Sequence, residues 1–553
     1  MRAGPARALC LTWAAVVVGT ATAAGFTAFK PGEVKVGGEI GHHIDLTVGK
    51  ILHHIDFERD FVRHFRNRTD PEGTVKDIPK DGPYGGFVGY GMLLDAMVSA
   101  SARGIGGEEM AGLTRRRLAE LVSLQGDDGS ISVFKSIPRG KISWPQRAIW
   151  DNHESSYILQ ALTADYLAFG TKATLEAAKR LADHMIEREE PVNIGGEAAF
   201  IRLWTATGDR RYRDWLFKTA GIDKGLADYD KIVSANGTRH VYTALARACA
   251  QIDFARAEKT DDVRYLAPAR ELMARLLGPY SSVSGSCSAG PHEKAWGETW
   301  MTSQRGTGRW GETCATAYMM RFAARMMSVD AASVYGDLIE RGLYNAFFSA
   351  QSLDGLTYRY FTPFEGASEW WPRDTYCCPN NFRREMFEVV DAVFLKTPSG
   401  VAVNLYSDAT LTTGGLKVEM RTDYPDGREI ALTVESAKPL ELALRIPRWC
   451  SAAEVSHLGG KDQPQAGAWH RVRLPEGRSS VYMVMPMKDR LVAGREEQAG
   501  KAAILQGPVV YGKDAAGMRV RYCDSSRVST YFVPSKRAET VPDELFAPDA
   551  PKR

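Results

Sequence analysis

The sequence predicts a mainly α-helical (α/α)6 barrel, followed by one or more all-β sandwich domains. Between about residues 82 and 395, apolar residues recur at spacings of three and four, which is the period of amphipathic helices. After residue 395 the period changes to two, in short segments separated by turns that contain glycine and proline. A long series of helices that returns on itself is typical of a helical barrel, whose loops surround a cavity at one end.

The first 24 residues predict a secretory signal peptide. Arg2 and Arg7 precede an apolar run over residues 8–18, and small residues follow at Ala21-Thr22-Ala23. This apolar run is too short to span a membrane, and no later segment is long and apolar enough to do so. We therefore expect a secreted or periplasmic protein that has no membrane partner.

Residues 25–398 form the predicted barrel domain. The clearest helical patterns cover residues 92–104, 155–170, 173–187, 239–257, 263–277, 313–328, 332–349 and 382–394. Weaker patterns at residues 56–66, 110–124 and 196–207 bring the count close to the twelve helices of such a barrel. Glycines or prolines separate most of these segments, as expected for helical hairpins.

Residues 399–534 form the predicted β-sandwich region. Strand patterns cover residues 401–406, 416–424, 428–436, 440–447, 470–475, 480–486 and 502–512, with "TGG", "PDG" and "PEG" as turns. The tail over residues 535–553 carries three prolines among many charges, so we expect it to be irregular.

Charge and composition limit the partners. The formal net charge is +3 over 553 residues, which gives no support for nucleic acid or an anionic membrane as a partner. Twelve tryptophans and 21 tyrosines are compatible with sugar binding, but aromatic residues more often fill the core.

Two short motifs carry the candidate chemistry. "WGETC" places Glu312 two residues before Cys314 at the start of a predicted helix, and "TYCCPNN" contains the adjacent pair Cys377 and Cys378, which we expect to lie in a loop. A glutamate at a helix start often has only a structural role. Adjacent cysteines rarely bond to each other, so this pair is buried and inert, bridged to distant partners, or gathered around a metal. Three thiolates and a carboxylate could hold zinc, although the CxxC pairs of many structural zinc sites are absent from the sequence.

The order of these motifs resembles glycoside hydrolase family 127. "GETCA", "YFTPFE" and "CCPNN" follow one another on the helical part, and "RHVYTALARA", "LALRIPRW" and "GPVVYG" are also similar to family sequences. Members are retaining β-L-arabinofuranosidases with a zinc-bound cysteine in the active site. The resemblance covers most of the chain after the signal peptide.

The resemblance implies roles for individual residues. The metal ligands fall on Glu312, Cys314, Cys377 and Cys378. Cys377 takes the place of the nucleophile, and Glu298 that of the general acid/base. Tyr360 and His240 are similar to residues that contact the sugar or the site. His153 in "WDNHESSY" is a looser candidate, and a helix-capping or helix-lining role explains it equally well.

These roles are chemically consistent. A retaining glycosidase needs a nucleophile and a group that donates and then accepts a proton. A zinc ion would deprotonate the attacking thiol. Glu298 must start neutral, and we expect the neighbouring Trp296 and Trp300 to raise its pKa.

The resulting expectation is a secreted, zinc-dependent retaining glycosidase that removes non-reducing-end β-L-arabinofuranose, or a similar sugar, from plant-type glycans. The β-domains would brace the barrel or help to form a homodimer. A non-catalytic carbohydrate-binding protein and a polysaccharide lyase on the same barrel are the alternatives, because a fold alone does not fix a function.

Overall fold

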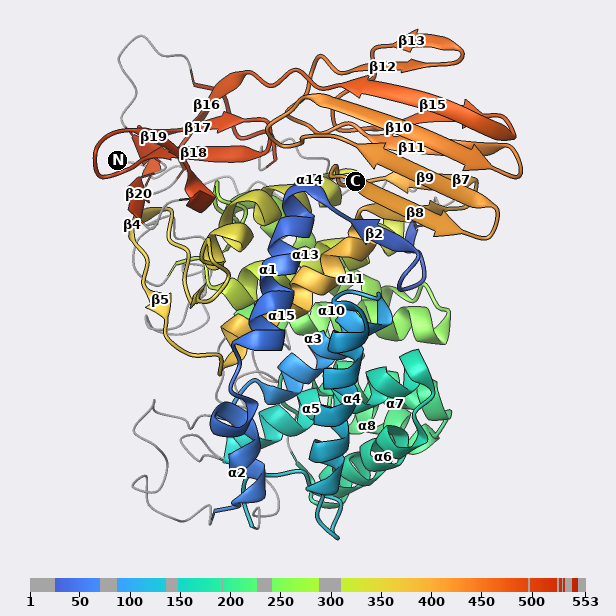
Figure 1. The fold of residues 1–553 in the computed structure, drawn as a ribbon, viewed down its shortest axis with the longest axis vertical. Helices are drawn as coiled ribbons and strands as arrows, with labels where there is room; N and C mark the ends of the chain where they lie inside the picture. The colour runs from blue at the N-terminus through green and yellow to red at the C-terminus, as the bar shows by residue number, and fades with distance from the viewer. Residues whose placement is uncertain are drawn as a thin grey trace, which may run out of the picture.

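A helical body carries a layer of β-sheets at one side (Figure 1). The computed structural model describes residues 25–69, 87–135, 148–190, 192–225, 241–287, 310–495, 498–524, 527–529, 531–532 and 540–545. The predicted signal peptide and most of the predicted irregular tail lie outside these residues.

The helical body contains a closed inner ring of helices. Each inner helix packs against the next, and the last returns to the first. In ring order they are α3 (Tyr90–Ala102), α5 (Ala148–Phe169), α7 (Gly196–Thr207), α10 (Val241–Glu258), α13 (Thr313–Asp330) and α15 (Cys377–Glu388). In α10 and in α13, 13 of the 18 residues are buried, because these helices contact neighbours on several sides.

A second set of helices covers the ring from outside, and each packs mainly against one inner helix. They are α1 (Gly38–His53), α4 (Gly107–Ser123), α6 (Lys172–Glu187), α8 (Arg210–Lys218), α11 (Val263–Arg275) and α14 (Val334–Gly342). Outer helices bury one face: in α6 the buried Thr174, Ala178, Leu181 and Met185 follow the period of four and three. These two layers form the predicted (α/α)6 barrel.

Two helices were not predicted from the sequence. In α8, five of nine residues are charged, and Tyr212, Trp215 and Leu216 are its buried side chains, so the periodic signal is short. Helix α1 buries Ile40, Ile44 and Ile51 on one face. Further turns of helix are η1 (Glu58–Val62), α2 (Arg63–Arg66), η3 (Leu276–Tyr280), η4 (Leu343–Phe347), η5 (Phe348–Ala350), η6 (Val389–Ala392) and η8 (Tyr522–Asp524).

The prediction that Cys377 and Cys378 lie in a loop is wrong. Helix α15 begins at Cys377, five residues before the predicted helix start at residue 382. Pro379 stands in the first turn, where a helix tolerates proline because the N–H groups there have no partner within the helix.

Two antiparallel-rich sheets form the sandwich above the barrel (Figure 1). The five-stranded sheet has the order β1-β6-β7-β11-β14, and the seven-stranded sheet has the order β13-β12-β15-β10-β9-β8-β2. Strand β10 (Glu429–Ser436) alternates exposed and buried residues, which is the period of two that predicted it. The N-terminal strands β1 and β2 pair with β6 and β8, so the start of the described chain also belongs to these sheets.

The bounds of these strands are β1 Thr27–Ala28, β2 Val34–Val36, β6 Phe394–Thr397, β7 Gly400–Val403, β8 Ala409–Thr413, β9 Leu416–Arg421, β11 Leu440–Arg445, β12 Glu454–His457, β13 Gly460–Asp462, β14 Trp469–Leu474 and β15 Gly477–Val484.

A third sheet has its own small apolar core, which includes Trp310, Phe364, Leu505 and Tyr522. Its main path is β16-β17-β18-β20-β4, with β19 on β18 and β21 on β17. The bounds are β4 Glu365–Ala367, β16 Asp489–Ala493, β17 Ala502–Gln506, β18 Val509–Lys513, β19 Arg519–Arg521, β20 Arg527–Ser529 and β21 Tyr531–Phe532. A separate ribbon pairs β3 (Tyr358–Arg359) with β5 (Trp370–Trp371).

A buried ion cluster joins the sandwich to the barrel. Arg445 of β11 is fully buried and contacts Glu340 Oε1 of α14 at 2.7 Å through Nη2, and it also pairs with Asp337. Its Nε donates to the carbonyl oxygen of Asn404 at 2.6 Å. Tyr424 donates its hydroxyl to the same oxygen of Glu340 at 2.7 Å. Burial raises the pKa of Asp337 to about 6, against the effect of Arg445.

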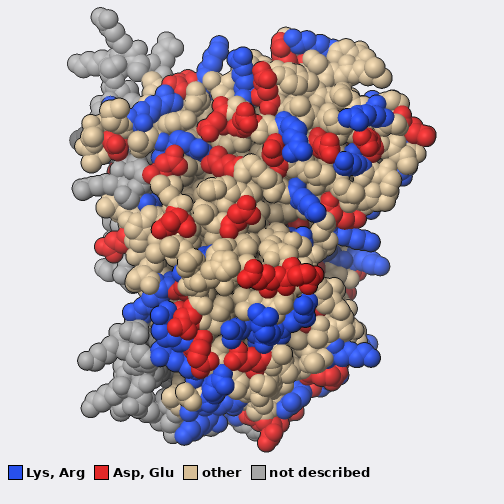
Figure 2. Space-filling model, in the orientation of Figure 1, with Lys and Arg blue, Asp and Glu red and all other residues tan. Residues whose placement is uncertain are grey.

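On the face shown in Figure 2, lysine and arginine alternate with aspartate and glutamate, as the small net charge suggests. None of the described helices has both the length and the hydropathy of a membrane span.

Candidate active site

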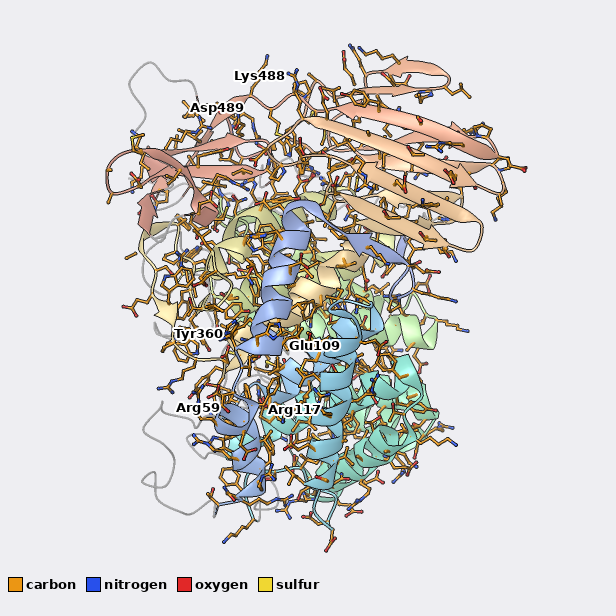
Figure 3. The ribbon with its side chains drawn as sticks, in the orientation of Figure 1. Arg59, Glu109, Arg117, Tyr360, Lys488 and Asp489 are labelled. Carbon is orange, nitrogen blue, oxygen red and sulfur yellow. The ribbon has the colours of Figure 1, made fainter. Side chains whose placement is uncertain are left out.

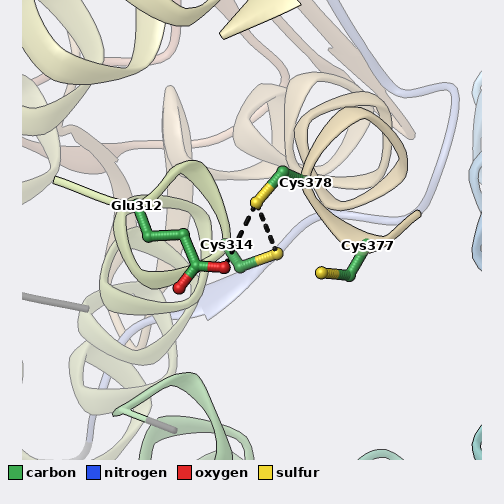
Figure 4. A group of neighbouring side chains, drawn as sticks. All are labelled: Glu312, Cys314, Cys377 and Cys378. Carbon is green, nitrogen blue, oxygen red and sulfur yellow. Dashed lines mark hydrogen bonds between the residues drawn. The ribbon is translucent and has the colours of Figure 1, made fainter. Parts of the chain in front are cut away.

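Four side chains meet where α13 and α15 begin: Glu312, Cys314, Cys377 and Cys378 (Figure 4). Glu312 is the residue before α13, and Cys314 is the second residue of that helix. The cysteine pair forms the first two residues of α15. Both helix N-termini therefore adjoin the cluster, and their partial positive charge favours thiolate and carboxylate anions there.

The candidate ligand atoms of these four residues all lie within 4.8 Å of one another. Cys314 Sγ is 3.2 Å from Cys378 Sγ, and Cys378 Sγ is 3.4 Å from Glu312 Oε1. The sulfur–sulfur distance is longer than the roughly 2.05 Å of a disulfide, and none of the three cysteines forms a disulfide with another described residue. The structure thus brings together the four residues that the family resemblance indicated as metal ligands.

The cluster is suited to a zinc ion. Its four residues are each at most 4% exposed. Burial raises the pKa of Cys314 and of Cys378 well above the usual range, and the adjacent thiols add to the effect. Several anions in one buried volume repel one another, whereas a divalent cation would stabilise the deprotonated forms. Thiolates and a carboxylate are ligands that zinc accepts, so the donor set and its spacing fit this ion.

A strained turn sets the position of the cysteine pair. Tyr376, just before α15, has φ of 79°, which is unusual for a residue with a side chain. Its N–H donates to the carbonyl oxygen of Val88 at 2.5 Å, and Asn380 Nδ2 donates to its carbonyl oxygen at 2.8 Å. Gly89 has φ of 103°, and a Cβ there would lie 2.6 Å from the carbonyl oxygen of Tyr376. The start of α3 therefore packs directly on the turn that carries the cysteines.

Tyr360 contacts the first cysteine of the pair. Its hydroxyl lies 3.0 Å from Cys377 Sγ. The carbonyl oxygen of Tyr360 accepts from Thr313 N–H at 3.0 Å, so "YFTPFE" and "GETCA" are joined by their backbones. The ring lies 5.1 Å from that of Trp371, and Figure 3 shows Tyr360 beside the helical body. Burial raises the pKa of Tyr360 well above its usual range, so the hydroxyl stays protonated and can donate to the sulfur.

His153 lies in the first turns of α5 and is 1% exposed. Its Nε2 is 3.2 Å from the hydroxyl of Tyr242, and its Nδ1 is 3.3 Å from Glu154 Oε1. Burial raises the pKa of Tyr242 well above its usual range, and Tyr157 and Cys377 add to the effect. His153 is therefore part of a buried hydrogen-bond network with Tyr242 and Glu154.

Glu298 and His240, the predicted acid/base and a predicted sugar contact, lie outside the described residues, as do Trp296 and Trp300. Their roles stay predictions.

Asn381 is a site residue that the sequence analysis did not identify. Its Nδ2 donates to Cys314 Sγ at 3.3 Å, and the side chain is buried. It stands four residues after Cys377 on the same helix face, so the motif "CCPNN" carried the signal in its spacing.

Buried carboxyl groups in and near the first turn of α5 were also missed. Burial raises the pKa of Asp151 to about 7, although Val133 N–H and Ser132 Oγ each donate to it at 2.8 Å. Burial raises the pKa of Glu190 to about 7 as well. Glu154 accepts from the backbone N–H groups at the start of α3, at 2.7 and 3.0 Å. The unusual density of polar residues in "WDNHESSY" was the available signal.

Comparison with known proteins gives consistent results. Residues 70–391 match the family model of the β-L-arabinofuranosidase GH127 catalytic domain, and residues 400–487 match that of the GH127 middle domain. A non-reducing-end β-L-arabinofuranosidase of Bifidobacterium longum subsp. longum is 23% identical over 494 residues, which cover 73% of this chain and 71% of that protein.

Two solved structures share the fold. A GH127 β-arabinofuranosidase superposes with a TM-score of 0.73 at 20% identity, over 90% of this chain and 87% of that chain. A GH127 β-L-arabinofuranosidase from Geobacillus stearothermophilus T6 gives a TM-score of 0.70 at 21% identity, over 87% and 86%. These likenesses confirm the predicted fold class, a helical barrel followed by β-domains. Since the catalytic-domain model alone matches more than half of the chain, this protein belongs to glycoside hydrolase family 127 and is a glycoside hydrolase.

Proposed function

We propose that the protein is a secreted, retaining β-L-arabinofuranosidase that releases non-reducing-end β-L-arabinofuranose from plant-type glycans. Cys377 is the proposed nucleophile, and Glu298 is the proposed acid/base. The observation that carries this proposal is the buried group of Glu312, Cys314, Cys377 and Cys378, whose ligand atoms lie within 4.8 Å of one another.

The arrangement supports different roles for the two adjacent cysteines. Cys378 contacts both Cys314 and Glu312, and these three residues would anchor a zinc ion. Cys377 lies to one side of them in Figure 4. Its sulfur contacts the hydroxyl of Tyr360. A sulfur at the edge of the group can reach a sugar, whereas one inside it cannot.

When bound, zinc supplies the positive charge that keeps these buried thiols ionised near neutral pH. The Tyr360 hydroxyl, 3.0 Å from Cys377 Sγ, would donate a hydrogen bond to the thiolate and fix its direction. Asn381 would donate a second hydrogen bond, to Cys314, and thereby hold a ligand that does not react.

The proposed reaction has two steps. Glu298 gives its proton to the glycosidic oxygen while the Cys377 thiolate bonds to the anomeric carbon and the carbon–oxygen bond breaks. Glu298, now a carboxylate, takes a proton from water as the water oxygen bonds to the same carbon and the carbon–sulfur bond breaks. Two inversions at one carbon leave the product with the configuration of the substrate.

Export and the glycan substrate rest on the sequence and the family. The basic residues and short apolar run of residues 1–24 support secretion or passage to the periplasm. The family model and the Bifidobacterium relative support an arabinofuranosyl substrate. A homodimer stays a proposal.

The test compares the wild type with Cys377→Ser and Glu298→Gln on p-nitrophenyl β-L-arabinofuranoside, together with zinc analysis of each protein. We expect each variant to lose more than roughly 1,000-fold in kcat, because each removes a reacting group. Cys249→Ser is the matched control, since this buried thiol lies on α10 outside the cluster. Chelator treatment should abolish activity, and added zinc should restore it.

Substantial activity in Cys377→Ser would overturn the assigned nucleophile. Full zinc occupancy in Cys314→Ser/Cys378→Ser would overturn the ligand assignment. An NMR assay that showed inverted product would exclude the two-step reaction.

A further inference from the structure

A second group of metal-binding residue types lies in the β-sandwich, far along the chain from the cysteine cluster. His457 of β12, Asp462 of β13 and His470 of β14 place one ligand atom each within 4.8 Å of one another. His457 Nε2 is 2.9 Å from Asp462 Oδ2, and His470 Nε2 is 3.1 Å from the same oxygen.

The sheet topology explains how these residues meet. The hairpin of β12 and β13 forms one edge of the seven-stranded sheet, and β14 forms one edge of the five-stranded sheet. The Asp462 carboxylate therefore stands between a histidine of its own sheet and a histidine of the opposite sheet. Figure 1 shows β12 and β13 at the outer end of the sandwich, away from the barrel.

Hydrogen bonds alone do not satisfy this arrangement. His470 Nε2 is buried and makes no hydrogen bond of acceptable geometry among the described residues, although the Asp462 carboxylate is close. A buried nitrogen beside a carboxylate oxygen, without a hydrogen bond between them, is what two ligands of one cation would show before the cation binds. Each histidine side chain is 17% exposed and that of Asp462 is 45% exposed, so an ion can enter from solvent.

We propose that His457, Asp462 and His470 form a second divalent-cation site, which joins the two sheets of the sandwich. Two imidazole nitrogens and a carboxylate favour zinc, nickel, cobalt or copper over calcium and magnesium, which prefer oxygen ligands alone. In a tetrahedral zinc site with bonds of roughly 2.0–2.1 Å, neighbouring ligand atoms lie slightly farther apart than the two distances here, so a small outward movement of the side chains suffices.

Binding has one local cost, which gives a specific signal. His457 Nδ1 accepts the N–H of Gly459 at 3.1 Å, so the hydrogen of the neutral ring is on Nε2. A cation at Nε2 requires this hydrogen to move to Nδ1, and the Gly459 N–H must then turn to water. Gly459 lies in the exposed turn between β12 and β13, where a backbone N–H can be solvated.

The site has a structural consequence. Among the described strands, β13 and β14 are each the last strand of their sheet. A cation that bridges these two edges would resist their separation. A cation that binds the folded state and not the unfolded state must stabilise the folded state.

The experiment counts metal equivalents on the full chain by equilibrium dialysis against cobalt, followed by elemental analysis. We expect two equivalents in the wild type and one in His457→Ala/His470→Ala. Asp462→Asn keeps the shape of the side chain. It should lower the affinity for the second cobalt ion by at least the roughly 10–100-fold that is lost when a group hydrogen-bonded to a metal ligand is removed. His53→Ala/His54→Ala is the matched control, because these exposed neighbours carry the same number of histidines.

Optical spectra separate the two sites. The cobalt ion that is lost in Cys314→Ser/Cys378→Ser should give intense sulfur-to-cobalt charge-transfer bands. The cobalt ion that is lost in His457→Ala/His470→Ala should give only weak visible bands. Cobalt should also raise the melting temperature of Cys314→Ser/Cys378→Ser. It should leave the melting temperature unchanged in a variant that combines these two substitutions with His457→Ala and His470→Ala. NMR should show a shift of the Gly459 amide on binding.

The proposal fails if the double histidine variant binds as many equivalents as the wild type. It also fails if the wild type binds a single equivalent and loses it in Cys314→Ser/Cys378→Ser. Neither result depends on enzymatic activity, so the test is independent of the proposed function.

Discussion

Arg445 gives the sharpest test of how the β-sandwich is attached to the barrel. This guanidinium of β11 is fully buried, and it is held by two carboxylates of α14 and by the carbonyl oxygen of Asn404. We consider Arg445→Met, which retains most of the apolar stem and removes the charge. Glu340 and Asp337, which are 1% and 6% exposed, then lose their cation.

The expected loss of stability is large. Breaking a buried pair by removal of one partner typically costs about 3–5 kcal/mol, because a charge stays buried without compensation. The loss depends on pH. Asp337 has a pKa raised to about 6 even beside Arg445, and without Arg445 this pKa rises further. Its neutral form favours the folded state, so stability is lost as pH rises through the folded-state pKa, and the variant should suffer less at pH 5 than at pH 8.

Urea unfolding at both pH values measures the effect. Arg478→Met is the matched control, because Arg478 pairs with Glu435 at 3.3 Å while their side chains are 71% and 48% exposed. An exposed pair contributes less than about 1 kcal/mol. If Arg445→Met lost no more stability than Arg478→Met at pH 8, the role of this cluster as the anchor between the domains would be wrong.

Three further changes test the site and its support. Tyr360→Phe removes a hydrogen bond to a charged sulfur, which is worth about 1.5–3 kcal/mol. The kcat on the aryl arabinofuranoside should therefore fall roughly 10–100-fold, while the zinc content stays unchanged. A loss of zinc instead would mean that Tyr360 supports the cluster rather than the reaction. Glu154→Ala leaves the buried N–H groups of Gly89 and Gly91, at the start of α3, without an acceptor. It should lower the free energy of unfolding by about 2–6 kcal/mol, and Glu154→Gln should lower it less; equal losses would contradict this role of Glu154. In the wild type, burial raises the pKa of Asp151 to about 7. Its ionisation therefore destabilises the fold by up to about 4 kcal/mol as pH rises from about 4 to about 7. The urea midpoints measured at these two pH values should differ less in Asp151→Asn than in the wild type, and an equal difference would refute the raised pKa of Asp151.

The sequence predicted the fold class well because its periodicities are strong. Inner and outer helices repeat at three and four, and the strands of the sandwich alternate, so their burial is encoded locally. Short or interrupted elements were harder. Helix α8 has few buried residues, and Pro379 concealed the first turn of α15, since a proline there can end a helix or begin one.

The sequence also supplied the residue types of the candidate site. "GETCA" and "CCPNN" contain Glu312, Cys314, Cys377 and Cys378, and the family resemblance indicated their roles. Spacing alone left burial, disulfide bonding and metal binding open, because Cys314 and Cys378 are 64 residues apart and nothing local fixes their distance.

The tertiary structure decided which of these residues meet. Closure of the helical ring brings the starts of α13 and α15 together, so that four side chains from two motifs share one buried volume. The same reason applies to His457, Asp462 and His470, which lie on edges of two different sheets and form no recognisable motif. Local sequence sets the period and the caps of each element, whereas contacts between distant elements depend on how their apolar faces pack, and only the folded chain fixes that packing.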